Sequence, residues 1–226
     1  MGQEEAVTQW TSGENLDEAL HDVPVFPLPQ VVLFPRALLP LHIFEPRYRA
    51  MLKDCVAGAG LLVMALLEDG PEDAAGQPPM ARIAGLGSIV ERHTLPDGRS
   101  NVVLLGRGRV RIEELPFVAP YRRARATVLR EDTSGVTQAD RLSLVHAATA
   151  FVGEIQRRDP KFAFHLPPQA EPGTMADLCA HHLILDPLRR QAILEELRVA
   201  ERVRLVLAEL MTQQATLGRA DKAQAN

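Results

Sequence analysis

The sequence has few of the features that mark secreted or nucleic-acid-coating proteins. Its two cysteines, Cys55 and Cys179, form neither a CxxC pair nor a ladder of spacings, which indicates buried thiols in a reducing compartment rather than a disulfide framework. A formal charge of −4 argues against a protein that mainly coats nucleic acid or anionic membrane. The first 22 residues carry six acids and no basic residue, so they lack the n-region of a secretory signal. These features predict a cytoplasmic protein.

Long uninterrupted hydrophobic runs are also missing from the apolar stretch 23–47. Each proline in this stretch removes a backbone donor that hydrocarbon could not replace, which excludes a transmembrane helix and gives no reason to expect a membrane partner. The interrupting prolines are Pro24, Pro27, Pro29, Pro35, Pro40 and Pro46.

Catalytic, nucleotide-binding and metal-binding motifs are missing as well. None of the three lysines is preceded by Gly or followed by Ser or Thr, so there is no Walker A loop, and Gly87-Ser88 does not form a GxSxG elbow. His181 and His182 could each share a helix face with Asp177 or Cys179, but the two couples point to different faces. The sequence predicts no enzyme activity, no cofactor and no metal site.

Residues 23–130 have mostly the pattern of β-strands. Short apolar runs edged by prolines lie at 23–28 and 39–44, and the continuous apolar run 61–67 predicts a buried central strand. Pro96-Asp97-Gly98 joins two β-rich runs and predicts a hairpin. The glycines of GLGSI and GRGRV lie inside these runs, where they indicate bulges or close backbone approaches rather than a phosphate cradle.

After residue 135 the apolar period becomes helical. Thr137 and Asp140 predict a capping box, Thr174 and Asp177 a second cap, and Asp186-Pro187 the start of a third helix. The closing helix is predicted from an apolar stripe formed by Val199, Val203, Val206, Leu207 and Leu210.

The fold class is therefore α+β, with a small β-barrel followed by a C-terminal helical bundle. We expect a flexible extension over 1–22, the barrel over 23–133, a helical subdomain over 134–211 and a flexible tail over 212–226.

The stretch FPLPQVVLFPRALLPLHIFEPRYRAML resembles the signature of the N-terminal substrate-binding domain of Lon-type ATP-dependent proteases, in a free-standing form. GLGSI, LPDGRSNVVLLGRGRVRI and PYRRARATV resemble the same family, and the similarity covers about 23–211. The resemblance implies a PUA-like barrel followed by helices. It also implies a substrate-binding domain that is not joined to the ATPase or protease domains. Arg36 departs from the family, which commonly has glycine in this turn.

The motif Phe44-Glu45-Pro46-Arg47-Tyr48 lies at a predicted strand-to-helix junction. Glu45 could act as an acid or base with Arg47 as its partner, but a carboxylate at a helix start also favours the macrodipole and pairs with an arginine. We interpret the motif as structural. Phe44 is expected to be buried, and Tyr48 to pack inward with the helix face formed by Met51, Leu52 and Cys55.

A basic strand supports an alternative function. Arg107, Arg109 and Arg111 alternate in sequence and are expected to project from one face, as RNA phosphates would require. The scarcity of aromatic residues for base stacking argues against RNA, and nearby glutamates offer partners for the arginines. A PUA-like RNA-binding module is kept as the alternative.

The connection 159–173 contains four prolines and two of the seven phenylalanines. Phe162, Phe164 and Leu166 alternate within it. They could either pack between the barrel and the helices or form an exposed apolar surface that binds unfolded chains. We expect a non-catalytic module that captures unfolded or apolar-rich polypeptides in a groove and by strand addition at a barrel edge. A separate ATP-dependent protease is a candidate partner.

Overall fold

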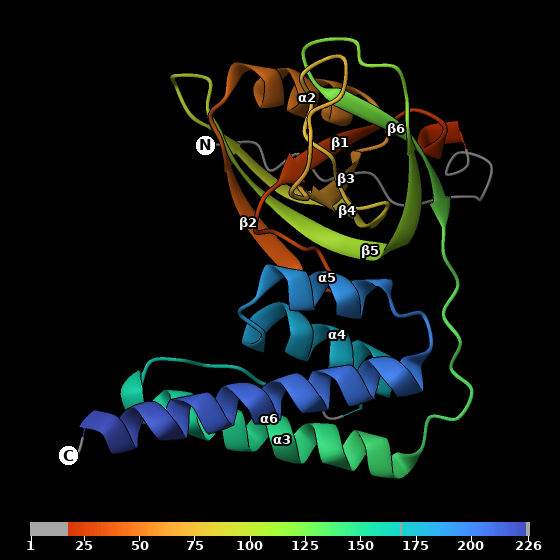
Figure 1. The fold of residues 1–226 in the computed structure, drawn as a ribbon. Coiled ribbons are helices and arrows are strands. Elements are labelled where there is room, and N and C mark those ends of the chain that lie inside the picture. Colours follow the sequence, from red (N-terminus) through yellow and green to blue (C-terminus); the bar gives the residue numbers. More distant parts are fainter. Residues whose placement is uncertain (1–17, 168, 225–226) are drawn as a thin grey trace. The chain divides into compact units, whose positions relative to one another are not determined.

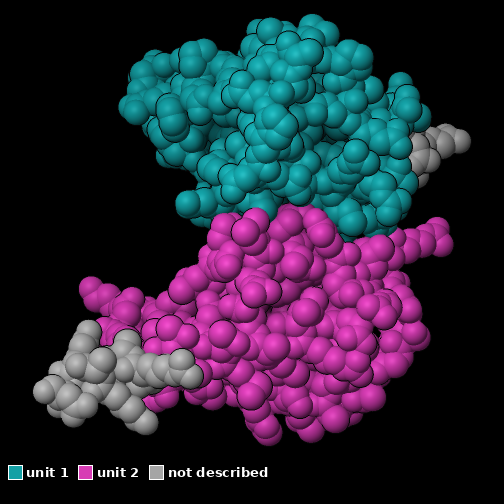
Figure 2. Space-filling model, viewed as in Figure 1, with its two compact units in different colours: residues 1–129 teal, residues 130–226 magenta. Residues whose placement is uncertain are grey.

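The computed structural model describes residues 18–167 and 169–224, so most of the expected extension 1–22 lies outside the described residues (Figure 1). The chain divides into two compact units, residues 1–129 and 130–226, which Figure 2 colours separately. Within the described ranges, no helix has both the length and the apolar character that a membrane crossing requires. The predicted subdomain boundaries at 133/134 and 211/212 stay predictions.

The first unit contains a nearly closed six-stranded barrel and the helix α2 (Pro46–Ala57), and residues 18–20 are also helical. The strand order is β2-β5-β4-β3-β1-β6, and a further pairing between β5 and β6 closes the ring. Closure is possible because β5 pairs with β2 through residues 100–105 and with β6 through residues 110–114. The predicted barrel is confirmed. The strands are β1 (Val23–Leu28), β2 (Leu38–Ile43), β3 (Leu61–Leu66), β4 (Ile83–Thr94), β5 (Ser100–Glu114) and β6 (Arg122–Val128).

Strand β3 is buried along its whole length because both of its faces meet apolar layers. Leu61, Val63 and Ala65 belong to one core cluster, whereas Leu62 and Met64 belong to another. The second cluster includes the predicted inner face of α2, formed by Tyr48, Met51, Leu52 and Cys55. This arrangement explains the continuous apolar run and confirms the predicted central strand.

The segment before β2 lies directly on glycines of β4 and β5. A methyl group at Gly106 would lie 1.9 Å from the carbonyl oxygen of Phe34, and one at Gly85 would lie 2.1 Å from that of Leu33. Gly106 also accepts a hydrogen bond from the N–H of Arg36 and donates one to the carbonyl of Ala37. The predicted close approaches are confirmed.

Arg36 has a φ of 63°, in the left-handed region that glycine adopts without strain. A glycine, which the family commonly has in this turn, adopts this backbone conformation without strain. Arg36 adopts the same conformation with the backbone strain that a Cβ adds.

The second unit consists of the four helices α3 (Gln138–Arg158), α4 (Pro172–Leu183), α5 (Pro187–Glu195) and α6 (Val199–Gln224). The capping box of α3 and the cap of α5 by Asp186 are confirmed. The predicted cap of α4 is wrong. Glu171 occupies the N-cap position, and Asp177 is buried inside the helix, where it lies 3.2 Å from Arg202. An acidic residue three positions after a threonine predicts a cap, but here the carboxylate serves an internal ion pair.

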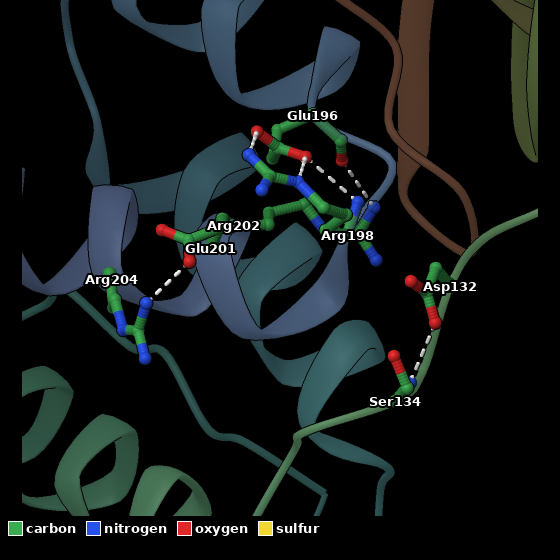
Figure 3. Close-up of polar contacts among 7 residues, drawn as sticks. All are labelled: Asp132, Ser134, Glu196, Arg198, Glu201, Arg202 and Arg204. Atoms are coloured by element: carbon green, nitrogen blue, oxygen red, sulfur yellow. Dashed lines mark hydrogen bonds and ion pairs between the residues drawn. The ribbon is translucent and has the colours of Figure 1, made fainter.

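The chain enters the second unit along the turn between α5 and α6. The backbone of Asp132 pairs with Leu197 and Val199, and its carboxylate accepts a hydrogen bond from the N–H of Ser134 (Figure 3). Arg202 is fully buried nearby and donates to the carbonyl of Glu196. The start of this unit is thereby fixed to its last helix.

Candidate functional site: an apolar groove in the helical unit

The connection between α3 and α4 forms one wall of a groove of about 680 Å³. Phe164 and Leu166 line this wall, and Met175 of α4 closes one end. The opposite wall is a face of α3 that includes Leu142 and Val145. Cavities of this size, lined mainly by apolar side chains with a few polar groups, are typical of binding sites. We call this surface the helical-unit groove.

The alternation expected in the connection is visible in its burial. Phe162, Phe164 and Leu166 are half-buried, whereas the residues between them are exposed. Phe164 and Leu166 reach the groove, but Phe162 does not line it. The main chain of Phe162 instead fixes the connection, because its carbonyl accepts a hydrogen bond from the side chain of Gln156 at 3.0 Å. The structure thus brings together two of the three predicted residues.

A histidine supports the groove from behind. The ring of His182 lies 5.5 Å from that of Phe164, measured between centroids. Burial lowers the pKa of His182 below its ordinary value, which favours the neutral imidazole. The support behind Phe164 therefore carries no positive charge at neutral pH.

Sequence reasoning did not identify the wall formed by α3. Leu144, Ala148, Phe151 and Val152 form the buried stripe of this helix, and Ala148 and Val152 also line the groove. Leu142 is 50% exposed although it is apolar. An apolar residue that lies off the stripe is the signal that could have found this wall.

The corner motif is structural except for one residue. Glu45 is the N-cap residue of α2, Pro46 is its first residue, and Glu45 pairs with Arg47 at 2.9 Å. Tyr48 packs inward, and burial raises the pKa of its hydroxyl. The expected burial of Phe44 is wrong, since its side chain is 58% exposed. Ile43 takes the inward position at the end of β2, so the next side chain turns outward.

The predicted arginine row does not share one face. Arg109 is buried with 1% of its surface exposed, whereas Arg107 and Arg111 are exposed. A bulge separates Arg107 from the other two, because Gly106 and Gly108 oppose the adjacent residues Gly87 and Leu86 and the alternation shifts by one. Arg109 and Arg111 both follow the bulge and differ in burial along the strand. The side chain of Arg107 donates to the hydroxyl of Ser88 at 2.7 Å. The row of three cations that favoured RNA is therefore not present as a surface.

The expected pairing of arginines with nearby glutamates is present on β6 and α6. Arg122 is buried and binds both carboxylate oxygens of Glu114, at 2.5 and 2.6 Å. Arg202 lies 3.0 Å from Glu131. These cations are committed to intramolecular carboxylates, which reduces the positive surface available to phosphates.

Neither thiol has the surroundings of a nucleophile. Cys55 and Cys179 are buried free cysteines, and desolvation raises the pKa of each thiol to about 12. A reactive cysteine needs a lowered pKa. The rings of His181 and His182 in α4 lie edge to face, with centroids 4.8 Å apart. Within the described residues no group of three or more His, Cys, Asp or Glu could hold a metal ion.

Comparisons with known proteins agree with the fold and with the sequence signature. The family model of the ATP-dependent protease La (LON) substrate-binding domain matches residues 22–212. A Lon protease of Roseiflexus castenholzii is 32% identical over 206 residues, which cover 89% of this chain and 25% of the relative. The Lon protease of Escherichia coli is 26% identical, over 83% of this chain and 24% of the relative. The chain spans about a quarter of the length of these relatives.

Two solved structures share the architecture. The N-terminal domain of the Mycobacterium avium complex Lon protease aligns over 84% of this chain and 98% of its own, with a TM-score of 0.62 and 16% identity. A Lon N-terminal domain protein from Xanthomonas campestris aligns over 83% and 97%, with a TM-score of 0.62 and 21% identity. The fold is therefore shared with Lon N-terminal domains. The chain belongs to the LON substrate-binding domain family.

Proposed function

We propose that this protein is a non-catalytic module that binds unfolded or apolar-rich polypeptides. The observation that carries the proposal is the helical-unit groove, because its size and apolar walls suit two or three side chains of an extended chain. Family membership supports the same class of ligand. A separate ATP-dependent protease is the partner to which such a module would deliver captured chains.

The mechanism that the geometry favours is capture in the groove. A free strand edge is present at β2, which pairs only with β5 among the described strands. Pro40 lies in the middle of β2 and has no N–H to offer an incoming strand. Of the two expected binding modes, capture in a groove and strand addition at a barrel edge, strand addition at β2 is therefore the less favourable. The exposed Leu38 and Phe44 at the ends of β2 form a second apolar surface on which a peptide could be found instead.

Affinity in the micromolar range is expected, which corresponds to about 8 kcal/mol and suits capture followed by release. The test is titration of a fluorescein-labelled apolar peptide against wild type, Leu142→Ser and Leu166→Ser. Leu142 is already half exposed, so its replacement should leave the fold intact while removing part of a groove wall. Leu188→Ser provides a matched control, because Leu188 is 66% exposed and does not line the groove.

We expect the two groove variants to weaken binding at least fivefold and the control to bind like wild type. Equal binding by all four proteins would place the peptide elsewhere, with Phe44→Ser as the next variant to examine. Undetectable binding to wild type at millimolar peptide would refute the proposal.

A further inference from the structure

Helix α2 lies beside the turn between β4 and β5 (Figure 1). Residues of these elements line a second concave surface, in the barrel unit. It measures about 570 Å³. One wall is the outer face of α2, and the other includes Arg92 and Thr94 of β4, Gly98 of the turn and Ser100 of β5. We call it the α2 groove.

Three cations line this groove. Arg49 and Lys53 lie one turn apart on α2, and Arg92 faces them from β4. Of the described residues that line the groove, none is acidic. Within the described part of the chain, neither Arg49 nor Lys53 forms an ion pair. This contrasts with β6, where Arg122 is bound by a carboxylate.

The guanidinium of Arg49 lies against the β4–β5 turn. A methyl group at Gly98 would lie 2.1 Å from a terminal nitrogen of Arg49, so the guanidinium is close to the backbone of the turn. Gly98 has a φ of +81°, which keeps glycine at this position and leaves space for the guanidinium. The planar fork of an arginine loses less conformational entropy per hydrogen bond when it binds an anion than a lysine does.

The floor of the groove between the cations is apolar. Leu52, Val56 and Pro46 contribute to it, and Val56 is 38% exposed. A free phosphate would use the cations and leave this floor uncovered. A peptide with an apolar residue beside a carboxylate would use both features, since carboxylates suit the arginine fork and the stem of a lysine packs well on apolar groups.

We propose that the α2 groove binds acidic polypeptide segments in which an apolar residue stands beside Asp or Glu. The proposal rests on the proposed function, polypeptide binding, and adds a second site with its own sequence preference. The helical-unit groove selects apolar side chains, and the α2 groove selects negative charge beside them.

The experiment compares two labelled peptides of twelve residues by fluorescence anisotropy at low salt. One contains Glu and Leu, and the other has every Glu replaced by Gln. The test variant is Arg49→Gln/Lys53→Gln. The control variant is Arg125→Gln/Arg157→Gln, which removes the same number of charges from exposed positions outside the groove. Lys53→Gln alone serves as a second test, because Lys53 is exposed and makes no contact on which folding depends.

We expect wild type to bind the Glu peptide at least tenfold more tightly than the Gln peptide. The test variant should lose this preference, Lys53→Gln should lose part of it, and the control should keep it. Equal losses in test and control variants would show general charge attraction and overturn the proposal. Full displacement of the Glu peptide by millimolar inorganic phosphate would overturn it in favour of a phosphate site. If wild type showed no preference for the Glu peptide but still bound the apolar peptide, this proposal would be refuted while the proposed function stood, so the two failures can be distinguished.

Discussion

Two glycines of β5 offer a sharp test of how the barrel is built. Gly106 and Gly108 are two residues apart in the same strand, yet their surroundings are opposite. A methyl group at Gly106 would lie 1.9 Å from the carbonyl oxygen and 2.8 Å from the carbonyl carbon of Phe34. At Gly108 the same methyl group would meet no heavy atom within 4 Å. The substitutions Gly106→Ala and Gly108→Ala therefore add the same atom to the same strand with different consequences.

The loss of stability expected from Gly106→Ala has two causes. The atoms that the methyl group meets are backbone, so they cannot turn aside as the end of a side chain could, and overpacking of this kind costs about 1–3 kcal/mol. Relief of the contact would also stretch the two hydrogen bonds between Gly106 and the segment 36–37, each worth about 1 kcal/mol. We expect Gly106→Ala to lower the free energy of unfolding by about 2–4 kcal/mol. Gly108→Ala should change it by about 0.5 kcal/mol at most.

The assay needs a signal from the barrel alone, because a protein with two compact units need not unfold in one step. The chain's two tyrosines supply it, since Tyr48 and Tyr121 are both buried in the barrel unit. Urea unfolding followed by tyrosine emission in a Trp10→Phe background would report this unit specifically. Equal stability of Gly106→Ala and Gly108→Ala would refute the close approach of residues 33–37 to β5.

Three further predictions concern single side chains. Phe44→Ala should cost less than about 1 kcal/mol in the same tyrosine-detected unfolding assay, because its ring is 58% exposed, and a loss above 3 kcal/mol would contradict its outward position. Thr137→Ala should cost about 1 kcal/mol of helical-unit stability at pH 7, measured by thermal circular dichroism. Hydrogen bonds from Thr137 lower the pKa of Asp140, so this contribution is present above the ordinary pKa of aspartate and is lost as the pH falls through the lowered one. A difference from wild type that persists unchanged at pH 2 would contradict this linkage. Asp177→Asn should cost about 3–5 kcal/mol, because Arg202 would keep a buried charge with a weakened partner, and helix-detected urea unfolding at wild-type stability would show that the pair is dispensable.

Local patterns predicted the barrel and most helix starts because each depends on residues close in sequence. The buried strand β3, the Pro96-Asp97-Gly98 turn and the capping box at Thr137 are of this kind. Phe44 and Arg109 were mispredicted because their orientation depends on where a strand ends and where a bulge falls. A bulge arises from two paired strands, and a pattern in one of them does not reveal it.

The candidate site was predictable only in part for a related reason. Phe164 and Leu166 were found because they alternate within a proline-rich connection. The facing wall of α3 and the position of Phe162 outside the groove depend on packing between α3 and the connection that follows it, such as the hydrogen bond from Gln156 to the carbonyl of Phe162. The α2 groove depends on contact between a helix and a hairpin turn that is about 40 residues later. No window of sequence contains both of its sides.

Backbone hydrogen bonds close both ends of the connection between the two units. The N–H of Leu129 donates to the carbonyl of Arg109 in the barrel, and Asp132 pairs with the turn between α5 and α6. Only Arg130 and Glu131 lie between these attachment points, a span of about 10 Å when fully extended. A covalent connection makes the second of two binding events intramolecular wherever one ligand reaches both grooves. A polypeptide that carries both an apolar and an acidic stretch would then bind with an avidity that depends on the distance between the stretches, and lengthening this connection by insertion would weaken that avidity while leaving each single-site affinity unchanged.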